Sequence, residues 1–105
     1  MIGLVLVTHG RLADELISAM EHVVGPQEKV KAICIEADDN MDQRRSQILS
    51  ATKIVSTKDG AIIATDMFGG TPANLAMSII SEKKVEIISG VNLPMLVKLA
   101  SCRDK

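Results

Sequence analysis

Residues able to carry out chemistry lie where short apolar runs of this chain end. His9 follows the aliphatic run Ile2 to Thr8, and Asp66 follows the run Gly60 to Thr65. Near pH 7 a histidine can act as a neutral nucleophile or a proton carrier. A carboxylate bonded to one ring nitrogen fixes the tautomer and leaves the lone pair of the other nitrogen free. If His9 and Asp66 face each other, they form such a pair.

The turn Gly69-Gly70-Thr71-Pro72, which follows Asp66 closely, adds a candidate anion site. Unpaired N–H groups and a partial positive charge make a helix N-terminus a binding site for phosphate, and glycines allow close approach of the backbone. We expect Thr71 to cap the next helix and Pro72 to take its first position. The turn matches neither the P-loop nor the dinucleotide pattern, so alone it is equally a plain glycine turn. Beside His9 it indicates a phosphorylated imidazole held by backbone amides.

An alternation of strands and helices must position these residues. Continuous aliphatic runs too short for helices predict buried strands, whereas Leu12, Leu16, Met20 and Val23 recur at helical spacing. We predict strands at 2–8, 29–35, 60–65 and 85–89, and helices at 12–24, from an Asp39 or Asn40 cap to 55, from 71 to about 82, and from Pro94 toward Cys102. This order predicts an α/β fold: one three-layer domain with a four-stranded parallel sheet and helices on both faces.

Ligands of open parallel sheets bind beyond the carboxyl ends of the strands. If the strand order is 2-1-3-4, the first and third strands are neighbours, and His9 and Asp66 face each other across the crevice. The predicted walls of this site are the residues around the strand ends: Thr8, Gly10, Met67, Phe68, Asn92 and Pro94. Met67 and Phe68 either form an apolar lip for a partner protein or are buried under their loop.

The composition excludes several classes of protein. The 105 residues are 47% hydrophobic and 24% charged, with a formal net charge of −1, so we expect a folded domain and no nucleic-acid partner. Two cysteines and two histidines without ligand spacing predict no metal site, and we expect no cofactor. The absence of a long apolar run or a signal peptide favours a reduced, cytoplasmic chain that does not insert into membranes.

Three segments carry a family resemblance: IGLVLVTHG, TDMFGGTPAN and SGVNLPML. In order and spacing they resemble the mannose-family (mannose/fructose/sorbose-type) enzyme IIA domains of the bacterial phosphoenolpyruvate-dependent sugar phosphotransferase system. The resemblance covers essentially the whole chain. It implies that His9 accepts a phosphoryl group from the phosphocarrier protein HPr and passes it to a IIB partner. It also implies that Asp66 orients His9, that Gly69, Gly70 and Thr71 bind the phosphoryl oxygens, and that Asn92 to Met95 help to wall the site.

The resemblance has one departure at the C-terminus. Family members usually continue with a further helix and an edge strand that takes part in a dimer, whereas this sequence stops at Lys105. A homodimer therefore stays an open possibility. Three interpretations of the shorter C-terminus remain: a shortened variant, a truncated product, or a protein that depends on its partner.

Other functions fit parts of the pattern. A receiver domain also carries a phosphorylatable aspartate after its third strand, but it needs an acidic pair where His9 stands. A small-molecule hydrolase or a passive anion-binding module is a further alternative, although no serine elbow or metal cluster supports hydrolysis. If the protein is a IIA-like phosphocarrier, it serves either sugar uptake or regulation. In the regulatory alternative, the phosphorylation state of His9 is a signal.

Overall fold

The computed structural model of the protein describes residues 1–79 and 84–103. Strands and helices alternate along the chain: β1 (Gly3–His9), α1 (Leu12–Val24), β2 (Val30–Ile35), α2 (Met41–Val55), β3 (Ala61–Thr65), α3 (Thr71–Ser78), β4 (Val85–Ser89) and α4 (Leu93–Cys102). The four strands form one sheet in the order β2-β1-β3-β4, and every neighbouring pair is parallel. The predicted α/β class and strand order are confirmed.

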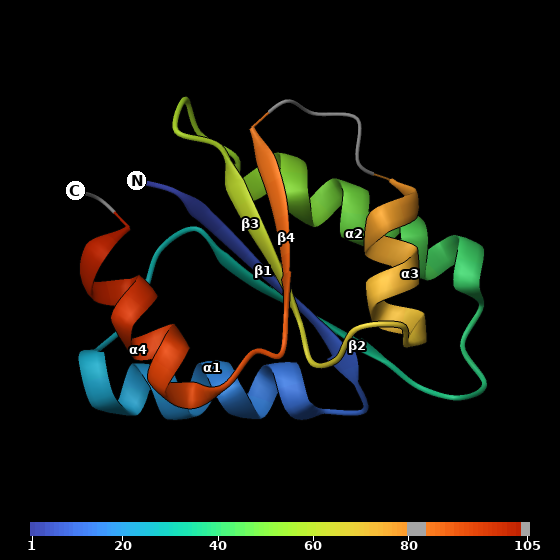
Figure 1. The fold of residues 1–105 in the computed structure, drawn as a ribbon, viewed down its shortest axis with the longest axis horizontal. Coiled ribbons are helices and arrows are strands. Elements are labelled where there is room, and N and C mark those ends of the chain that lie inside the picture. Colours follow the sequence, from blue (N-terminus) through green and yellow to red (C-terminus); the bar gives the residue numbers. More distant parts are fainter. Residues whose placement is uncertain (80–83, 104–105) are drawn as a thin grey trace.

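Helices cover both faces of the sheet, with α1 and α4 on one face and α2 and α3 on the other (Figure 1). Alternate side chains of β1 point to opposite faces, so both faces bury aliphatic residues. Leu6 packs in one cluster with Met20 and Leu96, and Val7 packs in the other with Ile48. The central strand is therefore fixed from both sides, which gives a rigid origin to the loop that follows it.

The strand register places the candidate residues side by side. In the β1–β3 pair, Val7 lies opposite Thr65, so the residues that follow leave the sheet at the same edge. On the other side of β1, His9 lies opposite Ile35, and the Gly10 N–H donates to the Ile35 carbonyl at 2.8 Å. The carboxyl ends of β2, β1 and β3 thus meet around His9.

The start of α3 corrects one prediction. Gly70, with extended backbone angles, is the N-cap, and Thr71 is already the first helical residue. Because Gly70 has no side chain, no side-chain cap hydrogen bond forms here, and Pro72 is the second helical residue, not the predicted first. The helix also ends earlier than predicted, at Ser78, where the Ile79 N–H donates to Ala76 three residues back and tightens the last turn. The rest of the predicted extension, residues 80–83, lies outside the described part of the chain.

Two asparagines cap helices. Asn40, the second of the two candidate caps, accepts a hydrogen bond from Gln43 N–H at the start of α2. Asn92 accepts one from Met95 N–H at 2.9 Å, so α4 begins at Leu93, one residue before the predicted start. Pro94 lies in the first turn of α4, where a missing N–H leaves no helical hydrogen bond unmade.

Candidate functional site

His9 and Asp66 form a hydrogen-bonded pair at the carboxyl edge of the sheet. The distance between His9 Nδ1 and Asp66 Oδ2 is 2.8 Å, and the backbone N–H of His9 donates to the same oxygen at 3.0 Å. The other oxygen, Oδ1, accepts the Met67 N–H at 3.0 Å. Both carboxylate oxygens are thus held, so the position of Asp66 fixes the orientation of the imidazole.

The electrostatics of the pair favour a charged carboxylate. Partial burial alone raises the pKa of Asp66, but the hydrogen bonds from the backbone and ring of His9, with the charge of that ring, outweigh burial and lower the pKa. An ionised Asp66 accepts a hydrogen bond from Nδ1–H, which selects the tautomer with a lone pair on Nε2. The His9 side chain is 49% exposed, against 13% for Asp66, so a partner molecule can reach the ring.

The N-terminus of α3 lies against the imidazole. A Cβ atom placed on Gly70 would lie 2.9 Å from Cε1 and 3.4 Å from Nε2 of His9, so the backbone approaches the ring as only glycine allows. The preceding Gly69 has φ +84°, a conformation that also favours glycine. Thr71 is exposed and lines a hollow of about 300 Å³ together with His9 and Gly10. Helix amides, a hydroxyl and the ring therefore share one surface.

Residues after β2 complete this hollow, and sequence reasoning missed them. Its lining also includes Ile35, Glu36, Ala37 and Met41. The signal was present in the strand order, because β2 is the other neighbour of β1 and its end must open onto the same edge as His9.

The remaining predicted wall residues have different surroundings. Thr8 is buried, and its Oγ1 accepts the Ala13 N–H at 2.7 Å, so it supports the first turn of α1. Asn92 and Pro94 shape the start of α4, and like Thr8 they are not among the residues that line the hollow beside His9. Met67 and Phe68 are 55% and 77% exposed, which excludes burial under the loop.

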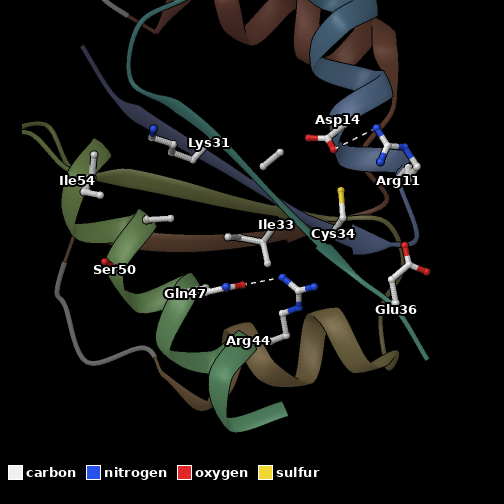
Figure 2. Close-up of a pocket in the computed structure, with 12 residues that line it drawn as sticks. Arg11, Asp14, Lys31, Ile33, Cys34, Glu36, Arg44, Gln47, Ser50 and Ile54 are labelled. Carbon is white, nitrogen blue, oxygen red and sulfur yellow. Dashed lines mark hydrogen bonds and ion pairs between the residues drawn. The ribbon is translucent and has the colours of Figure 1, made fainter. Parts of the chain in front are cut away.

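A second hollow, of about 600 Å³, lies at the outer edge of β2 between α1 and α2 (Figure 2). Its charged walls include Arg11, which pairs with Asp14 at 3.9 Å, and Arg44, which donates to Gln47 at 2.7 Å. Burial raises the pKa of the Cys34 thiol in this hollow, so the thiol keeps its proton at neutral pH.

Residues 1–79 and 84–103 contain neither a candidate metal centre nor a candidate membrane-spanning helix. No group of three or more His, Cys, Asp or Glu side chains there is arranged to hold a metal ion. None of the helices in this part of the chain is both long and apolar enough to cross a membrane.

The fold and the site together define a class: parallel α/β proteins that present a carboxylate-bound histidine beside a helix N-terminus. Comparison with known proteins identifies the family. Residues 3–105 match the family model EIIA-man, described as the PTS system fructose IIA component, and the chain belongs to this family of the phosphotransferase system. The resemblance seen in the three sequence segments is confirmed.

Relatives and solved structures agree with this assignment. The chain is 34% identical over 104 residues to the mannose-specific EIIAB component of Escherichia coli K12; the match covers 98% of this chain but only 32% of that protein, about a third of its length. It is 27% identical over 105 residues to the fructose-specific EIIA component of Bacillus subtilis, covering 99% and 72% of the two chains. The crystal structure of an EIIA component from Streptococcus agalactiae matches with a TM-score of 0.86 and 30% identity, covering 99% and 80%.

Proposed function

We propose that the protein is a phosphohistidine carrier of the sugar phosphotransferase system. In this proposal His9 accepts a phosphoryl group from HPr and passes it to a IIB partner, which serves sugar uptake. The observation that carries the proposal is the orientation of His9, with Nδ1 on Asp66 and an exposed ring beside the start of α3. Family membership supports the phosphotransferase role.

Phosphoryl transfer between two histidines depends mainly on the positioning of the reacting groups. The Nε2 lone pair of His9 attacks the phosphorus of the donor phosphohistidine in line with the N–P bond that breaks, and the donor imidazole leaves with the electron pair of that bond. A new N–P bond forms on Nε2, and the proton stays on Nδ1, hydrogen-bonded to the Asp66 carboxylate. The phosphorylated ring gains positive charge, which the adjacent carboxylate stabilises.

The start of α3 is suited to the phosphoryl oxygens. Asn74 is the first residue whose N–H bonds within the helix, to the Gly70 carbonyl, and Pro72 has no N–H. The amides of Thr71 and Ala73 are therefore left outside the helical ladder. These amides, the Thr71 hydroxyl and the positive end of the helix dipole favour an anion beside Nε2.

The partners and location follow from the same proposal. HPr and the IIB component dock in turn on the surface around His9, and this exchange takes place in the cytoplasm. The relatives named as mannose-, fructose- and sorbose-specific components support a role in sugar uptake without naming the sugar for this chain.

Intact-mass analysis with phosphoenolpyruvate, enzyme I and HPr tests the proposal. We expect the wild type to gain one acid-labile phosphoryl group, His9→Ala to gain none, and Asp66→Ala to gain it more slowly. His22→Ala is the matched control, because His22 is the only other histidine and is exposed on α1. If the folded wild type gains no phosphoryl group, or if His9→Ala still gains one, the proposal is wrong.

A further inference from the structure

Apolar side chains are exposed on two segments close to His9: the loop after β3 and the start of α1. Phe68 is 77% exposed, Met67 is 55% exposed, and Leu12, at the start of α1, is 42% exposed. Phe68 is also the only aromatic residue of the chain. The aliphatic residues fill the core, while the largest apolar side chain remains in water beside the candidate nucleophile.

The loop that carries Phe68 is fixed to His9 on both sides of this residue. Before it, Asp66 binds the ring and backbone of His9, and after it, Gly70 lies against the ring. Met67 is held by its N–H bond to the Asp66 carboxylate. Phe68 therefore projects from a short segment with both ends in contact with the site.

A protein that exchanges a phosphoryl group with His9 must bring its own reacting atom to within about 3–3.5 Å of Nε2. At that distance it covers the loop between Asp66 and Gly70 as well. Burying a phenylalanine side chain removes a large apolar area from water, and aromatic anchors are typical of the residues that dominate interface energies. Because this segment is already held in place, docking loses little conformational entropy there.

We propose that Phe68, aided by the exposed side chains of Met67 and Leu12, is the anchor by which the phosphoryl-donor protein docks over His9. This inference rests on the proposed function and adds to it the surface that recognises the donor. The donor surface that fits is apolar directly beside its phosphorylated side chain. Phe68 acts on the binding of the donor protein, whereas Asp66 acts on the ring that reacts.

Initial rates of phosphorylation, measured over a range of phospho-HPr concentrations, test the anchor. Phe68→Ala is expected to lower kcat/KM about thirtyfold, mainly through a higher KM, since anchor residues contribute about 2 kcal/mol or more. Phe68→Leu restores most of this loss, because it returns apolar area. Val23→Ala is the matched control: Val23 is 59% exposed, but it lies in the last turn of α1, away from His9. It should change kcat/KM by no more than about twofold.

Phosphoramidate, a small phosphoryl donor with no protein surface, separates docking from chemistry. With this donor we expect Phe68→Ala to lose far less activity than it loses with phospho-HPr. Equal losses of activity with both donors would mean that Phe68 acts on the geometry of the site, which would overturn the docking proposal. The proposal would also be wrong if Phe68→Ala and Val23→Ala were phosphorylated by phospho-HPr at the same rate. If neither donor labels wild-type His9, the proposed function itself fails, and the docking proposal fails with it.

Discussion

The hydrogen bonds that reach the Asp66 carboxylate couple its charge to folding. Their combined effect lowers the pKa of Asp66 in the folded protein, so the stabilisation is complete above the unfolded pKa of about 3.9 and is lost as the pH falls through the folded value. We expect the free energy of unfolding of the wild type to exceed that of Asp66→Asn at pH 7. The difference should shrink progressively below about pH 4, and urea unfolding at several pH values measures it.

The test depends on the difference between the unfolding free energies of the wild type and Asp66→Asn at each pH. Asp39 and Asp59 also have lowered pKa values, through Arg44 and the N-terminal amine respectively, and they titrate in the same range. Their contributions are common to both proteins and cancel in the difference. A difference that does not change with pH would contradict a carboxylate stabilised by His9.

Single residues also show what the sequence can and cannot predict. The neighbouring strands predicted the meeting of His9 and Asp66, because both follow adjacent parallel strands. The position of Thr8 at the end of a strand, directly before His9, predicts that it lines the site. Side-chain alternation instead places Thr8 on the same face of β1 as Leu6, beneath α1, where its hydroxyl accepts the Ala13 N–H.

The two glycines before α3 affect different properties of the protein. A methyl group on Gly70 would contact the His9 ring, although the φ of −86° suits any residue. A methyl group on Gly69 would meet nothing within 4 Å, but the φ of +84° is strained for alanine. We expect Gly70→Ala to slow phosphorylation with little loss of stability, and Gly69→Ala to lower the unfolding free energy by about 1 kcal/mol.

Phosphorylation rates and urea unfolding of these two variants, measured side by side, check the assignment. A Gly70→Ala protein that is phosphorylated as fast as the wild type would contradict the close packing of this backbone on the ring. The helix itself was predictable from Pro72 and the apolar pattern. The N-cap residue was not predictable, because proline is accepted at both the first and the second helical position. The cap could therefore be Thr71 or Gly70, and only the backbone angles identify Gly70.

At the scale of the whole molecule, the aliphatic runs predicted a parallel sheet, and the connection rules limited its strand order to a few possibilities, which include the observed order β2-β1-β3-β4. They gave no indication of how the amino-terminal edge of the sheet, opposite His9, is closed. There Arg103 is 4% exposed and donates to the carbonyls of Ile2 and Lys29, each at 3.2 Å. It also donates to the Glu28 carbonyl and the Gln27 side chain. A contact across about the full length of the chain leaves no periodic signal in the sequence.

Arg103 therefore joins the end of α4 to the starts of β1 and β2. Replacing it with methionine keeps the aliphatic part of the side chain but removes the donors whose hydrogen bonds the Ile2, Glu28 and Lys29 carbonyls accept. We expect Arg103→Met to lower the free energy of unfolding, measured by urea unfolding, by about 2–3 kcal/mol. Lys98→Met on the exposed face of α4 is the control for lost charge and should stay within about 0.5 kcal/mol of the wild type.

The same variant separates stability from function. His9 lies at the carboxyl ends of the strands, whereas Arg103 binds residues that precede β1 and β2. Under conditions where Arg103→Met remains folded, we expect its phosphorylation rate to match that of the wild type, because the rigid strands keep the geometry of His9 and Asp66. A folded Arg103→Met protein with a slowed rate would show instead that the two ends of the sheet are coupled.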